Sequence, residues 1–248
     1  GHQLGIDSAN FVITSFTRPN ITFRVIHPEN STRRYIREYL TAHRDEAGII
    51  YVNTRKGVDE LTAYLLEHHF PVAAYHAGMD PADRARVQDD FQFDRVNTIV
   101  ATSAFGMGID KSNVRFVLHA TSAQNIESYY QEAGRAGRDG LPSEAVLIYH
   151  PNDLRQYRWF IDQSTADDDY RDRQYQKLQA VANYASTPEC LQQYIVRYFG
   201  QDCPPCGHCS NCTDERTAQD ITAESQAVLK LVQELHGRFG KGVVAQAA

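Results

Sequence analysis

The sequence predicts an α/β protein in which a parallel β-sheet is covered by helices on both faces, followed by a smaller helical part rich in cysteine. Over residues 21–150, short apolar runs alternate with longer segments of helical periodicity, which is the pattern of repeated βαβ units. After residue 150 the apolar runs stop, and helical segments flank a dense group of cysteines. The 248 residues suffice for one or two domains.

The short apolar runs of the first part are typical of buried parallel strands. We expect strands at residues 21–26, 48–53, 72–75, 96–101, 114–119 and 144–149. The intervening segments carry apolar residues at helical spacing. We expect helices at residues 31–43, 56–69, 81–93 and 125–133, the first capped by Asn30 or Ser31, the second with Val58, Leu61, Leu65 and Leu66 on one side.

Three further segments complete the predicted organisation. Residues 1–20 have no clear period and are expected to be an inter-domain linker. Residues 151–218 are expected to form a helical, cysteine-containing subdomain with helices at 153–163, 170–184 and 188–199 and an acidic break at 167–169. A last amphipathic helix at 223–236 has little chain to pack against, so residues 219–248 are expected to begin a domain that is cut short.

Charge and hydropathy exclude several classes of protein. The formal net charge of −6 argues against a binder that works by bulk positive charge, although it permits a local basic groove. No apolar run reaches the ~18 residues that a membrane span needs. No secretory signal is present either. We therefore expect a cytoplasmic protein, nucleoid-associated if bacterial, with no membrane partner.

The most unusual stretch is QEAGRAGRDG at residues 131–140. Its three glycines each cost a helix about 1 kcal/mol relative to alanine, but they let the backbone approach another surface closely. Arg135 and Arg138 on such a turn suit a phosphate, because guanidinium binds phosphate bidentately. Gln131 shares a helix face with Arg135 if the helix continues that far. For an isolated pair of arginines, a solvated helix end is the simpler interpretation.

Polar residues also follow several strands, at the edge where open α/β sheets bind ligands. Thr102 and Ser103 offer hydroxyl and N–H groups to phosphates, and Asp110 offers a carboxylate to a ribose hydroxyl. The pair Gly106 and Gly108 allows close approach, but an ordinary βα turn would explain it as well. Three more polar residues follow strands, each unremarkable by itself: Asn53, Arg55 and His76.

Together these stretches resemble the second RecA-like motor domain of superfamily 2 helicases, and most closely that of the RecQ family. The phrases that carry the resemblance are AFGMGI, NIESYYQE and GRAGRDGLP, within residues 104–142. Residues 48–55 resemble motif IV, 74–78 the following loop that touches single-stranded DNA, 101–119 motif V and 125–140 motif VI. The resemblance covers residues 4–246, and residues 223–248 resemble the start of the family's winged-helix domain. It implies a RecA-like lobe over residues 21–150.

The resemblance also implies a role for each candidate residue. Arg135 and Arg138 would reach the γ-phosphate of ATP across the cleft between two lobes, and Gln131 would link the nucleotide to the inter-domain contact. Gly108 and Asp110 would face the nucleotide; Asp110 stands where some relatives have Asn. Five residues would line the DNA phosphate track: Asn53, Arg55, His76, Thr102 and Ser103.

The sequence lacks the elements that hold a nucleotide's triphosphate. It contains no Gly-x₄-Gly-Lys-[Ser/Thr] loop and no DEAH box. We expect ATP and Mg²⁺ to be shared with a first lobe outside this chain, and the chain alone to be inactive. In the longer protein the resemblance implies a 3′-to-5′ helicase acting on single-stranded and forked DNA. The alternative is a non-catalytic, zinc-bearing scaffold that binds nucleic acid.

Four of the five cysteines follow one another at Cys203, Cys206, Cys209 and Cys212. Four thiolates make a closed structural zinc site, and the spacing alone leaves Cys190 or Cys203 as the fourth ligand. An iron–sulfur cluster competes, but no Pro follows Cys212. A redox pair lacks its βαβ setting. The RecQ zinc domain takes one cysteine from a helix, and this resemblance selects Cys190 with Cys206, Cys209 and Cys212 for Zn²⁺.

Overall fold

The computed structural model describes residues 15–28, 31–106, 110–165, 167–215, 220–234 and 236. It divides the chain into two compact units, Gly1–Thr213 and Asp214–Ala248. The second unit contains helix α8, Thr222–Glu234, which has no buried residue. Among the described residues, no helix is long and apolar enough to cross a membrane.

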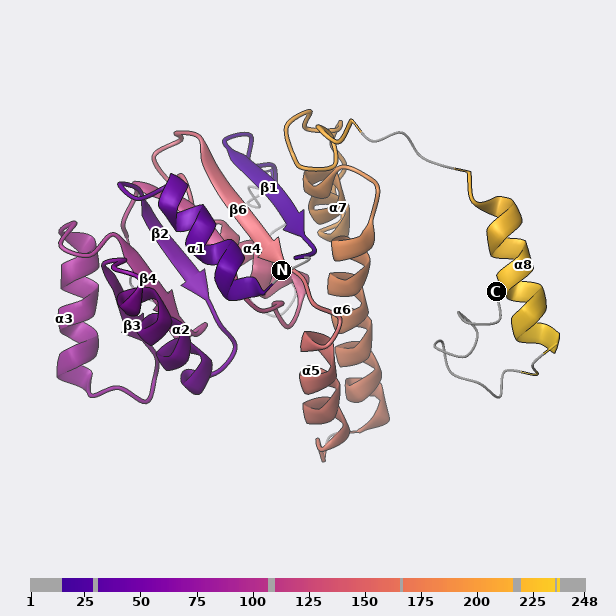
Figure 1. Ribbon diagram of the computed structural model, residues 1–248, viewed down its shortest axis with the longest axis horizontal. Coiled ribbons are helices and arrows are strands. Elements are labelled where there is room, and N and C mark those ends of the chain that lie inside the picture. Colours follow the sequence, from indigo (N-terminus) through magenta and orange to yellow (C-terminus); the bar gives the residue numbers. More distant parts are fainter. Residues whose placement is uncertain are drawn as a thin grey trace, which may run out of the picture. The chain divides into compact units, whose positions relative to one another are not determined.

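The first unit is built on a parallel sheet of six strands, which confirms the predicted fold class (Figure 1). The strands are β1 Ile21–Ile26, β2 Ala47–Tyr51, β3 Val72–Tyr75, β4 Thr98–Ala101, β5 Val114–His119 and β6 Ser143–Ile148. Their order across the sheet is β1-β6-β5-β2-β4-β3. The first strand therefore lies at an edge and pairs with the last, with Ile21 opposite Ser143.

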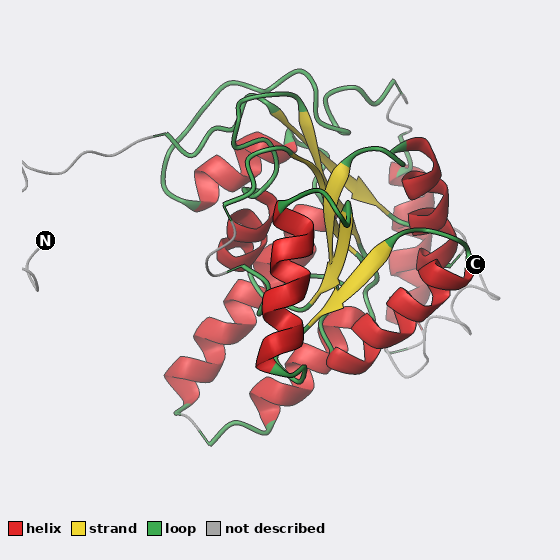
Figure 2. Ribbon diagram, turned by 90° about the vertical axis from the view of Figure 1, so that its left-hand side faces the viewer, coloured by secondary structure: helices red, strands yellow, loops and turns green. Residues whose placement is uncertain are grey.

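Helices cover both faces of the sheet, as Figure 2 shows. Helices α1 Thr32–Ala42 and α2 Arg55–Glu67 pack on one face, and α3 Pro81–Gln92 and α4 Ile126–Ala133 on the other. Strand β2 shows the alternation that this requires, because Ile50 packs with α1 and α2 while Ile49 and Tyr51 pack with α3 and α4. The strands read as continuous apolar runs because both faces are buried.

The second half of this unit is helical, with α5 Asp153–Asp162, α6 Asp168–Ser186 and α7 Leu191–Tyr198. These helices join the same core as α3 and α4. Glu127 of α4 ties to them directly, through Lys177 Nζ on α6 at 2.9 Å and the Tyr198 hydroxyl on α7 at 3.0 Å. Side-chain bonds therefore join α4 of the sheet region directly to α6 and α7.

Side-chain caps fix where two of the predicted helices begin. Of the two caps that the sequence offers for α1, Ser31 accepts a hydrogen bond from Arg34 N, and Asn30 lies outside the described residues. The predicted acidic break is instead the start of α6, because Asp167 accepts from Tyr170 N and the next two aspartates form its first turn. On α2, Leu66 was expected on the same side as Val58, Leu61 and Leu65; those three are buried, but Leu66 is 51% exposed.

Gly48 in β2 is packed too tightly to accept a side chain. A Cβ there would lie 1.9 Å from Cε2 of the buried Phe116 ring. We expect Gly48→Ala to destabilise the chain by about 1–3 kcal/mol, the usual cost of overpacking a core. A shift of the urea unfolding midpoint measures this, with Ala63→Ser on the exposed side of α2 as the control. Equal midpoints for the two variants would contradict the packing.

Candidate functional site

The carboxyl edge of the sheet contains a pocket of about 220 Å³. Of the predicted site residues, Asn53 after β2 and Ser103 after β4 line it. Asn53 is held in place by its own bonds, since its amide Nδ2 donates to Ser122 O at 3.1 Å and its backbone N donates to Thr121 Oγ1 at 2.9 Å. The other walls come from β5, α4 and α5, through residues such as His119, Glu132 and Tyr157.

His76, Arg55 and Gly78 form a second group after β3 and β2. His76 is buried, and both of its ring nitrogens are engaged. Nδ1 accepts from Gly78 N at 3.1 Å, so Nε2 carries the proton and donates to Asp59 Oδ1 at 3.0 Å. Arg55 is exposed and its side chain passes close to Gly78. His76 therefore shapes this loop, while Arg55 is the residue with a free approach to solvent.

Thr102 forms the turn between β4 and the glycine-rich loop. Its backbone N donates to Tyr75 O at 3.1 Å, and its carbonyl accepts from Phe105 N at 2.9 Å. Because β4 lies between β2 and β3, the strand ends of Asn53, Thr102 and His76 follow one another along one edge. Gly108 lies outside the described residues.

The arginine turn, residues 134–140, follows directly after α4. The helix ends at Ala133 with Gly134 as its C-cap, so Gln131 and Arg135 do not share a helix face. The shared face was expected only if the helix continued to Arg135. It does not, because glycine has a low helix propensity and Gly134 ends the helix one residue before Arg135. Gln131 itself is exposed.

The two arginines of this turn have different surroundings. Arg135 Nη1 donates to Gly106 O at 2.7 Å, and its buried Nε has no hydrogen-bond partner. Arg138 is more open: its side chain is 38% exposed, and Nη1 lies 3.6 Å from Oδ1 of Asp110, whose side chain is 98% exposed. Arg135 thus fixes the loop after β4, whereas Arg138 and Asp110 present opposite charges to solvent.

A Cβ on Gly106 would lie 2.3 Å from Arg135 Nη2, so the glycine leaves room for this guanidinium. The same guanidinium lies near the Tyr51 hydroxyl, which donates to Phe105 O at 2.9 Å. Burial raises the pKa of Tyr51, and the positive charge of Arg135 opposes that rise. Arg135 is therefore part of a buried polar network beneath the loop.

Four cysteine sulfurs gather beside β1. The Sγ atoms of Cys190, Cys206, Cys209 and Cys212 all lie within 4.8 Å of one another, and those of Cys190 and Cys209 are 3.9 Å apart. A tetrahedral zinc site with bonds of about 2.3 Å separates its sulfurs by about 3.8 Å. The fifth cysteine, Cys203, is not in this cluster. Cys190 is the N-cap residue of α7 rather than a residue within a helix.

Backbone donors surround the cluster, but its thiols differ in how readily they ionise: the pKa of Cys190 is lowered, whereas burial raises those of Cys206 and Cys212. Backbone N–H groups donate to three of its sulfurs: Cys206 N to Cys190 Sγ at 3.2 Å, Cys209 N to Cys206 Sγ at 3.3 Å and Leu191 N to Cys209 Sγ at 3.4 Å. Burial opposes ionisation of Cys190, but hydrogen bonds from the backbone N–H groups of Cys206 and Gln193 and from the thiols of Cys206 and Cys212 outweigh it and lower its pKa to about 7. Burial raises the pKa of Cys206 to about 12. A divalent cation would relieve the competition among the four thiols.

The loop that carries the cysteines also covers the outer edge of β1. Ser210 N donates to Phe23 O at 3.0 Å, and Ser210 Oγ accepts from Val25 N at 3.4 Å. Asn211 Nδ2 ties the same loop to the segment before α7 through the carbonyls of Thr187 and Glu189. An edge strand that would otherwise expose unpaired backbone groups is thereby protected.

Sequence reasoning missed two groups of residues in this region. The first is the pair of His119 Nε2 and Glu132 Oε2, 2.7 Å apart, with side chains 1% and 14% exposed. No spacing rule connects a histidine at the end of a strand with a glutamate on the next helix. The second is Arg18 and Asn20, which we predicted to lie in a linker but which bond to the arginine turn.

Two family profiles match consecutive parts of the chain. The helicase conserved C-terminal domain matches residues 31–140, and the RecQ zinc-binding domain matches residues 151–213. Among solved structures, S. cerevisiae Dbp5 bound to RNA and ADP BeF3 is similar with a TM-score of 0.51 at 20% identity, over 66% of this chain and 46% of that chain. The likeness supports the fold.

Full-length sequences give closer relatives. The chain is 47% identical over 245 residues to the ATP-dependent DNA helicase RecQ of Bacillus subtilis, covering 98% of this chain and 41% of the relative. It is 40% identical over 241 residues to the enzyme of the same name from Haemophilus influenzae, covering 96% of this chain and 38% of the relative. The chain thus spans about two fifths of the length of these relatives.

The parallel sheet, the arginine turn and the two matched profiles define a class: the carboxyl-terminal RecA-like lobe of a helicase, joined to a zinc-binding domain. The zinc-binding profile and the identity over nearly the whole chain then specify the family. The chain belongs to the RecQ family.

Proposed function

We propose that this chain forms half of a split nucleotide pocket and part of a DNA track in a longer, RecQ-type 3′-to-5′ DNA helicase. The other half, with the phosphate-binding loop and the Mg²⁺ ligand, belongs to a first lobe. ATP would close the two lobes on single-stranded DNA, and hydrolysis would reopen them. The observation that carries the proposal is the pairing of Arg138 and Asp110 at an open glycine turn.

The two arginines are proposed to act differently. Arg138 is the open one, so its guanidinium would reach the γ-phosphate and stabilise charge as the phosphoryl group transfers. Arg135 is committed to Gly106 O and would hold the loop of residues 102–106 in position. Asp110 would accept from a ribose hydroxyl and would orient Arg138 until nucleotide arrives. Gln131, exposed beside the turn, would contact the first lobe.

DNA is proposed to pass along the carboxyl edge of the sheet. Ser103 and Arg55 are exposed there and would contact phosphates, while Asn53 lines the adjoining pocket. His76 would act indirectly by holding the Gly78 loop. Single-stranded and forked DNA are the proposed substrates; the name of the Bacillus subtilis relative states DNA alone.

The four clustered cysteines are proposed to hold one structural Zn²⁺. Bound zinc would cross-link α7 to the loop of residues 203–213 and would have no open coordination position for catalysis. The protein's own residues supply the rest: backbone N–H groups orient the sulfurs, and Asn211 fixes the loop.

ATP hydrolysis tests the split pocket directly. We expect the 248-residue chain alone to hydrolyse ATP no faster than a buffer blank, with or without single-stranded DNA, because it contains no phosphate-binding loop. A longer protein that includes the first lobe should show DNA-stimulated hydrolysis in a coupled phosphate-release assay. DNA-stimulated turnover by the chain alone would refute the proposal, and so would a longer protein with no turnover.

A further inference from the structure

Residues 16–20, which we call the strap, lie across the arginine turn. The sequence suggests only a linker here, yet each end of the strap is bonded to a different part of the first unit. One end holds the turn that carries Arg135 and Arg138, and the other holds α7. The segment therefore has a fixed place in the folded protein.

Two side chains of the strap donate to four carbonyls in and after the turn. Arg18 Nη1 donates to Gly134 O at 3.0 Å, and Nη2 donates to Ala136 O at 2.9 Å. Asn20 Nδ2 donates to Gly137 O at 2.7 Å and to Leu141 O at 3.1 Å. The last carbonyls of a helix lack partners within it, and a cation is favoured at that end. Arg18 supplies both the donors and the charge.

This contact requires glycine most strongly at position 137. A Cβ on Gly134 would lie 3.3 Å from Arg18 Nη1, and a Cβ on Gly137 would lie 2.4 Å from Asn20 Nδ2. Gly137 also has a φ of +59°, which side chains rarely adopt. Glycine at position 137 therefore lets the strap approach the backbone of the turn closely.

The other end of the strap is anchored on α7 and the residues after it. The backbone N of Arg18 donates to Oε1 of the buried Gln192 at 3.2 Å, and that of Phe16 donates to Gln201 Oε1 at 3.1 Å. The Phe16 ring stacks on Phe199 with centroids 4.5 Å apart. Gln192 is two residues beyond Cys190, so the strap connects the cysteine cluster to the arginine turn.

We propose that Arg18 is a positioning residue for ATP hydrolysis: by bonding Gly134 O and Ala136 O, it holds the arginine turn in the geometry that presents Arg138 to the γ-phosphate. This inference rests on the proposed function. Arg18 touches no nucleotide and acts only through the turn. Loss of its fork would leave the charge of Arg138 in place but would remove two of the bonds that hold the turn.

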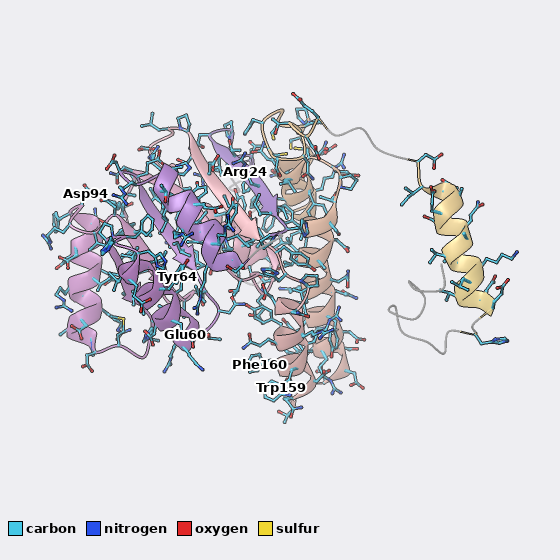
Figure 3. The ribbon with its side chains drawn as sticks, viewed as in Figure 1. Arg24, Glu60, Tyr64, Asp94, Trp159 and Phe160 are labelled. Carbon is cyan, nitrogen blue, oxygen red and sulfur yellow. The ribbon has the colours of Figure 1, made fainter. Side chains whose placement is uncertain are left out.

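The test uses the longer protein with both lobes. Arg18→Ala should lower kcat by about 10- to 100-fold, the effect of misplacing a catalytic group by about an ångström. KM for ATP and Kd for single-stranded DNA should stay within twofold of the unaltered protein. Arg18→Lys, which keeps the charge but not the fork, should restore only part of kcat. Arg24→Ala is the matched control: Figure 3 labels this arginine on β1. Its side chain is 45% exposed and paired with Glu144.

A double-mutant cycle separates this role from a structural one. If Arg18 acts through Arg138, adding Arg18→Ala to Arg138→Ala should lower kcat no further. Additive losses, or an unchanged kcat in Arg18→Ala, would overturn the positioning role. An unchanged kcat in Arg138→Ala would instead overturn the proposed function. Hydrogen exchange on the 248-residue chain gives an activity-free measure: Arg18→Ala should speed exchange at residues 134–141 and leave residues 47–51 unchanged, and equal protection of residues 134–141 would count against the inference.

Discussion

Arg138→Ala in the longer protein is expected to lower the kcat of ATP hydrolysis about 10³-fold or more, the range that an arginine finger contributes to phosphoryl transfer. The reason is the loss of a partly exposed guanidinium that would meet the charge developing on the γ-phosphate. Binding of single-stranded DNA should change little, because the DNA track is assigned to other residues. Steady-state ATPase rates and fluorescence anisotropy with labelled DNA measure the two effects.

The control for this variant is Arg95→Ala, which removes a second exposed arginine that is paired with an aspartate. It lies after α3 in the same unit and should leave kcat unaltered. Neither substitution should shift Tm appreciably, since exposed ion pairs contribute about 0–1 kcal/mol. Equal ATPase rates for Arg138→Ala and Arg95→Ala would show that the arginine turn has no part in hydrolysis.

Cys206→Ser is expected to abolish stoichiometric zinc binding and to unfold the cysteine loop. Structural zinc sites have apparent binding free energies of about 10–16 kcal/mol. The folded state loses this stabilisation when zinc no longer binds. Because the loop covers β1, its release should also expose backbone groups of Phe23 and Val25 to other chains. Elemental analysis should report the lost metal, and light scattering should report association of the variant.

Cys203→Ser makes the matched comparison, because it changes the neighbouring cysteine by the same single atom. Its sulfur lies outside the cluster, and its contribution to the loop is a backbone carbonyl that accepts from Gln193 Nε2 at 2.6 Å. We expect one zinc per chain and an unaltered Tm. Loss of zinc in Cys203→Ser would contradict the assignment of Cys190, rather than Cys203, as the fourth ligand.

Local signals in the sequence were enough to predict the six strands and the parallel sheet, because apolar runs and helical periodicity depend on neighbouring residues. The predictions failed where a tertiary contact or a helix cap determines the structure. Asp167 turns an apparent acidic break into a helix start. Leu66 has the right spacing for the core, yet its side chain is 51% exposed. Helical periodicity shows which side of a helix faces the core, but not how many residues on that side are buried.

For the candidate site too, local motifs were predictive and long-range contacts were not. The motifs locate Arg138, Asp110 and the cysteines in the chain, but spacing alone cannot tell that Arg135 is bonded beneath a loop while Arg138 is open. Nor can it connect Arg18 with Gly134, since 116 residues separate the two. Such a contact depends on the order of the strands in the sheet. Because β1 lies beside β6, the strap that precedes β1 meets the arginine turn that precedes β6.

The placement of β1 beside β6 has a consequence for biosynthesis. The ribosome synthesises β1 before the other strands of the sheet. Ser143, which lies opposite Ile21, follows 122 positions later in the chain. Until then the nascent β1 has no strand to pair with, and such long-range closure is intrinsically slow. The lobe therefore acquires its edge strand, and the segment leading into it, only near the end of its own translation.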